Sequence, residues 1–428
     1  MAKTLWTAES LQQALGLSGL PPIHGGITGI SIDSRTVQPG DLFIPLKGPN
    51  FDGNEYVAEA LTKGAGAALT DRTINGAITV EDTFEALQGL ATFKRQQTAA
   101  KIIAITGSSG KTSVTRALAH ALTSQGTTHS SYKSFNNKIG LPVIMASLPD
   151  DAAYYVQELG MSEAGEISNM VKLLRPHMSI ITMVGPAHLE YFNSVDDIAR
   201  AKAEVMKTLP ADGLAALPKS SPYFDILKDA AGAHSVAEFT AFINPPANLP
   251  GPHWAENVGA ILAITNHLDL PQDDILKALK TFNLPAGRGE RSVCQIKDTP
   301  FTMIDESYNA NPASIVASLH VLSTVPGRKI AILGDMLELG KNSPALHADL
   351  ADAVTETAPD LIITHGPMMQ HLHQAIPSNI NKIHCESLDD IQEKLASSLQ
   401  PHDTVMIKGS NGTKLHTLVD RFKQLHAA

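Results

Sequence analysis

The most informative segment is Ile102-Ile-Ala-Ile-Thr-Gly-Ser-Ser-Gly-Lys-Thr-Ser113, in which an apolar strand leads into a glycine-rich loop and then a helix. Successive backbone N–H groups, a helix N-terminus and Lys111 can together bind the polyphosphate of a nucleotide, while the Thr112 hydroxyl can ligate Mg²⁺. The loop is a shortened variant of G-x-x-x-x-G-K-[ST], because Ile105 occupies the place of the first glycine. A plain glycine turn between a strand and a helix is the alternative.

Length and composition predict several domains. At 428 residues the chain is too long for one ordinary core, and roughly 150 residues per domain predicts about three domains. Hydrophobic residues make up 43%, yet no segment approaches the ~20 consecutive apolar residues of a membrane span. The N-terminal segment lacks the continuous apolar run of a secretory signal, so we expect a cytoplasmic protein without a membrane span.

Charge and cysteine content exclude other classes of protein. The net charge is −10 and no block of lysine or arginine occurs, so there is no electrostatic basis for binding nucleic acid. The only cysteines, Cys294 and Cys385, are far apart and form no C-x-x-C pair, which argues against a disulfide framework or a zinc–thiolate site. We expect both thiols to be buried.

The pattern of strands and turns predicts three α/β domains. Residues 1–98 alternate short β-rich runs with turns and close with a helical pattern around 84–91. Residues 99–290 alternate apolar strands with helix-length segments, as in a parallel sheet wrapped by helices. A Pro/Gly-rich hinge at 284–290 leads into residues 291–428, a predicted doubly wound domain. Strands are expected at 27–35, 41–47, 65–71, 102–106, 154–159, 179–184, 214–217, 301–304, 330–333, 361–364, 382–384 and 405–408.

Two candidate side chains are expected at the carboxyl edge of the central sheet. Glu158 ends an apolar run, where a carboxylate could hold a metal ion against a nucleotide. A solvent-exposed glutamate at a strand end is the alternative. His188 follows the strand at 179–184 and comes to the same edge, although one of 17 histidines carries little information alone.

A lysine interrupts an apolar helix face. Lys202 shares that face with Ile198, Val205 and Leu209. One interpretation is that its side chain extends to solvent. The other is a buried lysine that is held neutral by desolvation, despite a reference pKa of about 10.4. A neutral amine can react with CO₂ to form a carbamate, which turns a cation into a metal-binding anion.

Further candidates lie near the hinge and in the first domain. The run Asp305-Glu-Ser-Tyr-Asn-Ala-Asn-Pro312 offers an acid suited to ribose hydroxyls and an aromatic ring and amides suited to adenine, but it is equally compatible with a plain turn. Arg288 could reach a phosphate from the hinge, although hinge arginines are usually solvated. Ser34-Arg35 and Phe51-Asp-Gly-Asn54 mark turns that by themselves indicate no function.

Taken in order, these motifs resemble the Mur ligase family over nearly the whole chain. Besides the phosphate-loop segment and the run Asp305–Pro312, the motifs that carry the resemblance are SFNNKIGLP, ELGMSEAGEI, VGPAHLEYF, ARAKAEV, GPHWAENV, GRGE, LGDMLELG and IKGSNG. Within the family, YNANP, GDMLELG, NNKIGLP and GPAHLE are similar to the branch that adds a dipeptide, and the DNPR motif of the diaminopimelate-adding branch is absent. Glu306 and Phe135 depart from the family pattern, which often has aspartate and glycine there.

The resemblance implies a three-domain Mur ligase architecture. An N-terminal domain would bind the uridine diphosphate end of the substrate, a central P-loop-type domain would bind ATP, and a Rossmann-like C-terminal domain would close over both. The implied activity joins D-alanyl-D-alanine to UDP-N-acetylmuramoyl-tripeptide through an acyl phosphate, with ATP and Mg²⁺, in a monomer. The tripeptide's third residue, diaminopimelate or lysine, stays open.

The resemblance also implies roles for matching residues. Thr112 and Glu158 would ligate the first metal ion, and His188 and Lys202, as N6-carboxylysine, the second. The implied catalytic residues are Lys111, Glu158, His188 and Lys202. The implied ATP-binding residues are Gly107, Ser108, Ser109, Gly110, Lys111, Thr112, Ser113, Asn257, Arg288, Asp305 (ribose), Tyr308 and Asn309. The implied substrate-binding residues are Ser34, Arg35, Asp52, Gly53, Asn136, Asn137, Lys408, Ser410 and Asn411.

Two rival functions stay open from the sequence. A nucleotide sensor without catalysis would bind ATP and close its domains, but the joint presence of Lys111, Glu158, His188 and Lys202 argues against it. A related amide ligase, such as one that extends folate with glutamate, would share the ATP site. The motifs Ser34-Arg35 and Phe51-Asp-Gly speak against a folate substrate.

Overall fold

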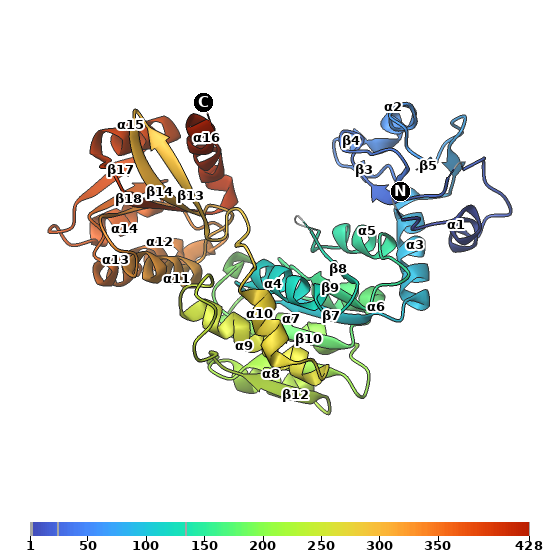
Figure 1. The fold of residues 1–428 in the computed structure, drawn as a ribbon, viewed down its shortest axis with the longest axis horizontal. Helices are drawn as coiled ribbons and strands as arrows, with labels where there is room; N and C mark the ends of the chain where they lie inside the picture. The colour runs from blue at the N-terminus through green and yellow to red at the C-terminus, as the bar shows by residue number, and fades with distance from the viewer. Residues whose placement is uncertain (1–2, 24, 133–134, 428) are drawn as a thin grey trace.

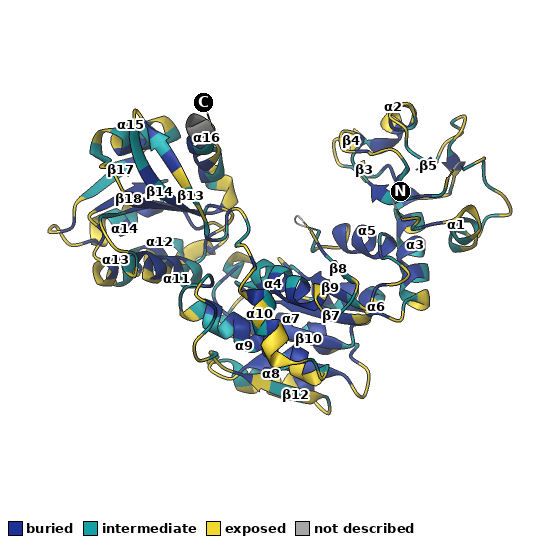
Figure 2. Cartoon of the chain, in the orientation of Figure 1, coloured by how far each residue is buried: buried dark blue, intermediate teal, exposed yellow. Residues whose placement is uncertain are grey.

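The computed structural model describes residues 3–23, 25–132 and 135–427, so Ser134, the first residue of the SFNNKIGLP motif, lies outside the described residues. The chain forms an N-terminal, a central and a C-terminal lobe, and the two outer lobes stand apart on the central one (Figure 1). Each lobe has its own sheet. The sheet strands and the helices against them are the buried parts of each lobe (Figure 2). The predicted α/β class is therefore confirmed, while the predicted domain boundaries stay predictions.

The N-terminal lobe has a small parallel sheet in the order β1-β2-β5-β6. Its core gathers Trp6, Leu11, Leu42 and Leu69. The predicted runs at 27–35, 41–47 and 65–71 contain β1, β2 and β5, respectively. The elements are α1 (Ala8–Leu15), β1 (Gly29–Ser31), β2 (Asp41–Phe43), β3 (Lys47–Gly48), β4 (Phe51–Asp52), α2 (Val57–Thr62), β5 (Ala67–Thr70), β6 (Ile78–Thr79) and α3 (Thr83–Gln97).

Polar contacts, one of them fully buried, join the N-terminal lobe to the central lobe. The indole N–H of Trp6 donates to the carbonyl of Ala146 at 2.8 Å. The Lys94 ammonium donates to the carbonyl of Leu5 at 2.8 Å and to Asp150 at 2.5 Å, and it lies 4.8 Å from the Trp6 ring centre. The Arg95 guanidinium donates to two carbonyls at the end of α6 (Glu166–Leu174), each at 2.7 Å. Helix α3 is thereby fixed to the central lobe along its last turns.

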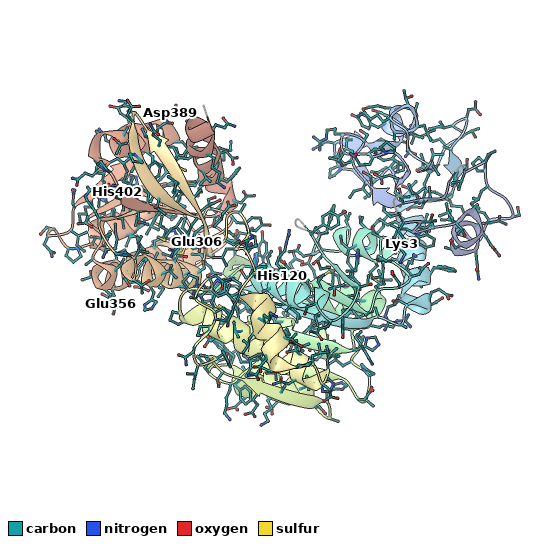
Figure 3. All side chains as sticks on the ribbon, in the orientation of Figure 1. Lys3, His120, Glu306, Glu356, Asp389 and His402 are labelled. Atoms are coloured by element: carbon teal, nitrogen blue, oxygen red, sulfur yellow. The ribbon has the colours of Figure 1, made fainter. Side chains whose placement is uncertain are left out.

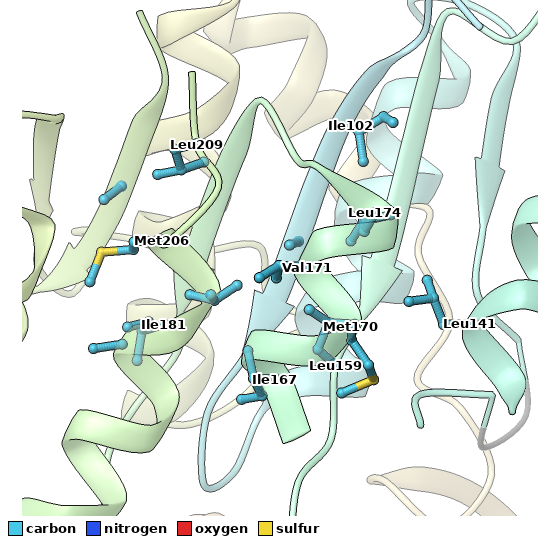
Figure 4. Packing of buried hydrophobic residues seen from close by; sticks show 14 of the residues in the cluster. Ile102, Leu141, Leu159, Ile167, Met170, Val171, Leu174, Ile181, Met206 and Leu209 are labelled. Carbon is cyan, nitrogen blue, oxygen red and sulfur yellow. The ribbon is translucent and has the colours of Figure 1, made fainter. Parts of the chain in front are cut away.

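The central lobe is a parallel sheet in the order β12-β11-β10-β7-β9-β8, with helices on both faces. Successive residues of a strand point to opposite faces, so Ile102 packs towards α6 and Ile103 towards α4. Figure 4 shows the first of these two cores. The elements are β7 (Lys101–Thr106), α4 (Lys111–Thr123), β8 (Thr128–Ser130), α5 (Gly140–Ala146), β9 (Tyr154–Glu158), β10 (Met178–Ile181), α7 (Val195–Ala203), β11 (Leu214–Pro218), α8 (Phe224–Ala231), β12 (Ser235–Phe239), α9 (Pro252–His267) and α10 (Gln272–Leu279).

The C-terminal lobe is a doubly wound sheet in the order β13-β14-β18-β15-β16-β17. All neighbours are parallel except β13 and β14, which form an antiparallel edge that the sequence analysis did not predict. Cys294 and Cys385 are buried, as expected. The elements are β13 (Glu290–Ile296), β14 (Thr299–Glu306), α11 (Pro312–Ser323), β15 (Lys329–Gly334), α12 (Ser343–Ala348), α13 (Ala351–Thr357), β16 (Leu361–His365), α14 (Met369–Ala375), β17 (Lys382–Cys385), α15 (Leu388–Ser398), β18 (Asp403–Lys408) and α16 (Leu415–Ala427).

Helices of membrane-spanning length and hydropathy are absent from the part of the chain that the structure describes.

Candidate functional site

The candidate site is a cavity of about 670 Å³ where the central and C-terminal lobes meet. The central lobe contributes the phosphate loop, defined as residues 107–110, with the start of α4 and the end of β9. The C-terminal lobe contributes Arg288, Glu306, Tyr308 and Lys408. Figure 3 labels Glu306 at this junction. The cavity therefore lies at the carboxyl edge of the central sheet, where parallel α/β sheets bind ligands.

The phosphate loop has the backbone conformation that its glycines permit. Gly110 precedes α4 with φ +81°, in the left-handed region, and a side chain at Gly107 would overlap the hydroxyl of Thr182. That hydroxyl donates to the carbonyl of Ser109 at 2.5 Å, which ties the loop to the strand end of β10. The Lys111 ammonium donates to the carbonyl of Gly107 at 2.9 Å. The order of strand, glycine-rich loop and helix is therefore the predicted one, and the binding of phosphate by the loop stays a prediction.

The end of β9 meets the start of α4 through Glu158. Its carboxylate accepts from the hydroxyl of Thr112 at 2.5 Å and from the side-chain amide of Asn136 at 2.8 Å. Glu158 is buried, so the alternative of a solvent-exposed glutamate is wrong. The three side chains line the cavity together, and the predicted role of Thr112 and Glu158 in holding a metal ion stays a prediction.

Lys202 is buried in α7 and does not extend to solvent. Its exposed fraction is 1%, and its helix neighbours Ile198 and Val205 are buried with it. Burial, reinforced by the positive charge of Lys111, holds the pKa of Lys202 well below its usual range. Among the described residues Lys202 forms no hydrogen bond or ion pair. A buried amine of this kind is poised to be neutral, which carbamate formation requires.

Lys202 lies close enough to Lys111 and His188 for their charges to interact, and it could take part in a magnesium site only as an anion. Within the described ranges no three His, Cys, Asp or Glu side chains cluster in a way that could hold a metal ion. Glu158 and Thr112 supply oxygen donors of the type that Mg²⁺ prefers. A carboxylated Lys202 would add two more oxygen atoms and remove a positive charge from the site.

His188 contacts the C-terminal lobe. Its Nδ1 lies 2.5 Å from Oε2 of Glu338, although the two groups do not align as a hydrogen bond. Burial lowers the pKa of His188, against the opposing influence of the Glu338 carboxylate, while Lys111 and Lys202 lower it further. The imidazole also lines the cavity. The ring therefore stands between the lobes.

Arg288 and the end of β14 form the opposite wall. The Arg288 guanidinium stacks over the Tyr308 ring at 4.1 Å from its centre. The Lys408 ammonium lies 3.5 Å from Glu306 and donates to the carbonyl of Asn309 at 3.1 Å. Burial raises the pKa of Glu306 and lowers that of Lys408, and each charge opposes the shift of the other. Cationic groups thus face the phosphate loop across the cavity.

Asp305, expected to hold ribose, is engaged in hydrogen bonds within its own part of the chain. Its carboxylate accepts from the backbone N–H of Gly287 at 2.8 Å and from the backbone and hydroxyl of Ser307 at 3.1 and 2.6 Å. It is 3% exposed and does not line the cavity. Neighbouring residues of a strand point to opposite faces, so Glu306 enters the cavity in its place.

Other predicted residues are divided between the cavity and the rest of the molecule. Asn257 on α9 lines the cavity, and a side chain at Gly110 would lie 3.1 Å from its amide oxygen. Asn137 also lines it while accepting from two backbone N–H groups at the start of α5. The lining further includes Ser108, Ser109, Gly110, Lys111, Thr112, Ser113, Asn136, Arg288, Tyr308, Asn309 and Lys408.

The remaining predicted substrate residues lie elsewhere. In the N-terminal lobe, Arg35 is 84% exposed and paired with Asp33, and Asp52 is paired with Arg72. The buried Ser410 accepts from the backbone of Leu337 at 3.0 Å and donates to the carbonyl of Ala310 at 3.3 Å, so it holds the C-terminal lobe together. The predicted residues outside the cavity lining are Ser34, Arg35, Asp52, Gly53, Gly107, Lys202, Asp305, Ser410 and Asn411.

Several residues of the site were missed as candidates although their motifs were noted. Asn311, in the YNANP motif, caps α11 through Ser314 and donates from its amide to the carbonyl of Ser108 in the phosphate loop at 3.3 Å. Glu338, in the LGDMLELG motif, contacts His188. His253 lines the cavity from the start of α9. Each residue lies in a motif that the sequence analysis noted, but the spacing of residues along the chain does not predict contacts between lobes.

Comparisons with known proteins match the whole length of this architecture. Residues 26–97 match the Mur ligase family catalytic domain, residues 105–248 the Mur ligase middle domain, and residues 287–411 the Mur ligase glutamate ligase domain. The sequence is 31% identical to a UDP-N-acetylmuramoyl-tripeptide–D-alanyl-D-alanine ligase from Rickettsia prowazekii (strain Madrid E), over 98% of this chain and 100% of that protein. The enzyme of the same name from Escherichia coli (strain K12) is 31% identical over 92% and 93% of the two chains. A crystal structure of MurF from Acinetobacter baumannii superposes with a TM-score of 0.81 at 30% identity, covering 98% and 99%.

Proposed function

The chain belongs to the Mur ligase family, and we propose that it uses ATP to join D-alanyl-D-alanine to UDP-N-acetylmuramoyl-tripeptide. The product is the UDP-muramoyl-pentapeptide precursor of peptidoglycan. The observation that carries the proposal is the shared cavity, in which the phosphate loop of one lobe faces Arg288 and Lys408 of the other. A cytoplasmic monomer stays a prediction.

The reaction needs ATP because a carboxylate is a poor electrophile and its oxygen is a poor leaving group. Transfer of the γ-phosphoryl group to the terminal carboxylate of the tripeptide gives an acyl phosphate. The amine of D-alanyl-D-alanine then attacks the acyl carbon through a tetrahedral intermediate, and phosphate leaves. The acyl phosphate must be protected from water until the amine arrives, which is consistent with a site formed where two lobes meet.

The first step places a polyphosphate beside a carboxylate, so like charges must be offset. We assign the phosphates to the N–H groups of the phosphate loop, to the start of α4 and to Lys111. Arg288 reaches the same space from the C-terminal lobe, and its stacking on Tyr308 fixes the plane of its guanidinium. Preorganised cations of this kind stabilise the charge that develops during phosphoryl transfer.

Mg²⁺ belongs to the proposal because the donor set suits it. Thr112 and Glu158 would hold one ion and His188 and carboxylated Lys202 a second, and when bound they would offset the negative charge of the phosphates and of the substrate carboxylate. Lys202 supports this assignment because it is buried, without a partner among the described residues, and repelled by Lys111. Carboxylation would turn that repulsion into attraction.

The nucleoside is assigned to the C-terminal side of the phosphate loop. Asn257, adjacent to Gly110, is suited to adenine, and so are Tyr308 and Asn309. The ribose role passes from Asp305 to Glu306, because only the latter has a carboxylate in the cavity. The uridine end of the substrate is assigned to the turns with Ser34, Arg35, Asp52 and Gly53 of the N-terminal lobe, and the peptide to Asn136, Asn137, Lys408 and Asn411.

The test is phosphate release by the purified chain. With ATP and Mg²⁺, release is expected only when both UDP-N-acetylmuramoyl-tripeptide and D-alanyl-D-alanine are present, and mass spectrometry should show the pentapeptide product. Parallel assays with the diaminopimelate and lysine forms of the tripeptide identify the third residue. ATP binding without dependence of phosphate release on both substrates would favour a nucleotide sensor and contradict the proposal.

A further inference from the structure

The loop that follows β15 touches the central lobe beside the cavity. This docking loop, residues 335–342, meets the short helix η2 (Leu189–Tyr191) that follows His188. The backbone N–H of Glu190 donates to the carbonyl of Glu338 at 3.2 Å. A side chain at Gly340 would lie only 3.2 Å from the Cα of Glu190. The two backbones are therefore packed against each other.

The side chains of His188 and Glu338 meet at the same place. Both residues have a left-handed backbone, with φ of 58° and 63°. Such conformations cost energy for residues other than glycine and are retained where the surroundings require them. The Nδ1 atom of His188 is enclosed, and Oε2 of Glu338 lies 2.5 Å from it. Because the Glu338 side chain is 48% exposed, it can rotate to align its carboxylate with the ring N–H.

The position of the carboxylate decides which ring nitrogen is free. A carboxylate that accepts from Nδ1–H fixes the tautomer in which Nε2 carries the lone pair, and it also fixes the orientation of the ring. The ring lines the cavity, so the nitrogen left free is the one able to bind a metal ion there. Among the described residues no hydrogen bond holds the His188 ring in place.

The docking loop does not depend on Glu338 for its own shape. Asp335 accepts from the backbone of Met369 at 2.8 Å, and the backbone N–H of Met336 donates to His347 at 2.9 Å. The backbone of Leu337 is bound by Ser410 at 3.0 Å. These contacts lie within the C-terminal lobe, so removal of the Glu338 side chain leaves the loop supported.

We propose that Glu338 is a positioning residue, which orients the His188 imidazole so that Nε2 faces the cavity. The carboxylate comes from the C-terminal lobe and the imidazole from the central lobe. Docking of the two lobes therefore completes the orientation of His188, and the metal site is fully formed only in the docked arrangement. This inference rests on the proposed function, because it concerns the metal ion that the ligase reaction needs.

The test measures metal binding and ring tautomer in the full chain rather than turnover alone. Mn²⁺ is titrated in the presence of a non-hydrolysable ATP analogue and free Mn²⁺ is followed by electron paramagnetic resonance. Glu338→Ala is expected to weaken Mn²⁺ binding about 10- to 100-fold, as is typical when a partner of a ligating histidine is lost. Glu338→Gln keeps an oxygen acceptor and should retain most of the affinity. Glu356→Ala is the matched control, because Glu356 is exposed on the same lobe, away from the junction (Figure 3).

The ¹⁵N spectrum of labelled histidine gives the second readout. The His188 signals, assigned by their loss in His188→Asn, should show a protonated Nδ1 and an unprotonated Nε2 in the wild type and a mixture of tautomers in Glu338→Ala. Wild-type Mn²⁺ affinity with an unchanged tautomer in Glu338→Ala would overturn the proposal, and so would a wild-type protein that binds no Mn²⁺ with the analogue. Neither measurement requires turnover, so a chain that binds Mn²⁺ as described but makes no pentapeptide would refute the proposed function alone.

Discussion

The hydroxyl of Thr112 lies 2.5 Å from Oε2 of Glu158, so the first turn of α4 touches the carboxylate that ends β9. The two residues are 46 positions apart in the chain. They meet because adjacent parallel strands end at the same edge of the central sheet. The contact brings two oxygen donors to the mouth of the phosphate loop.

This contact predicts different outcomes for two substitutions of Thr112. Thr112→Val keeps the shape but removes the hydroxyl, and we expect the kcat of ligation to fall by more than about 10-fold. Thr112→Ser keeps the oxygen and should stay close to wild type. Phosphate release at saturating ATP, measured over a range of Mg²⁺ concentrations, checks this. A valine variant with wild-type kcat and only a lower melting temperature would restrict the hydroxyl to a structural role.

The buried amine of Lys202 predicts a chemical rescue. Lys202→Ala should lower ligation by more than about 100-fold, because it removes an expected ligand rather than a ligand's partner. Formate, acetate or propionate should restore part of the rate by supplying the missing carboxylate. The exposed Lys280 provides the control variant Lys280→Ala, which should behave as wild type. An alanine variant at position 202 with unimpaired turnover would remove this lysine from the metal site.

Two neighbouring carboxylates should give opposite phenotypes. Asp305→Asn weakens the buried acceptor for Gly287 and Ser307, and we expect a loss of about 1–3 kcal/mol in the free energy of unfolding. Glu306→Gln should leave stability nearly unchanged while raising the KM for ATP. Urea unfolding and ATP-dependent kinetics on both variants separate these roles. A raised KM for ATP in Asp305→Asn, with normal stability, would return the ribose role to Asp305.

His253 predicts a loss of stability in mild acid. Burial, with the nearby charges of Lys408 and His320, lowers its pKa to about 4 from an ordinary value of 6.5. Between these two values the unfolded chain binds a proton that the folded chain does not, so stability falls as the pH decreases through this window. The expected loss from pH 7 to pH 5 is about 2 kcal/mol.

The variant His253→Gln should lose that much less stability over the same range. Urea unfolding of both proteins at pH 7 and pH 5 measures the difference. Parallel pH dependence in the two proteins would show that His253 is already protonated in the folded state at pH 5.

Local features of the site could be predicted from the sequence, whereas contacts between lobes could not. The phosphate loop is one continuous segment, so its residues already carry its shape. The apolar helix face on which Lys202 lies is compatible with burial and with extension to solvent, and the structure shows that Lys202 is buried. The sequence did not show that Glu306 rather than Asp305 lines the cavity, because neighbouring residues of a strand point to opposite faces and composition does not reveal which face is the cavity. The contact of Glu338 with His188 joins loops that are 150 positions apart, and no spacing rule reaches that far.

The secondary structure followed the same rule. The central parallel strands of the second and third lobes are apolar runs between helices, and they lie where they were predicted, whereas the edge strands β8 and β12 of the second lobe were not predicted. Strand β13 was not predicted, because its exposed residues, such as Val293, break the apolar pattern of a buried strand. It pairs at the edge of the sheet, where one strand side faces solvent.

The fixed joint between the N-terminal and central lobes also sets a length. Trp6, Lys94 and Arg95 hold α3 against the central lobe, so the distance from the turns proposed to bind uridine to the phosphate loop is set by packed side chains. A substrate held at its nucleotide end must therefore be long enough to span this fixed distance. An extended peptide gains roughly 3.3–3.6 Å per residue, so a precursor one residue short would present its carboxyl group too far from the γ-phosphate to react.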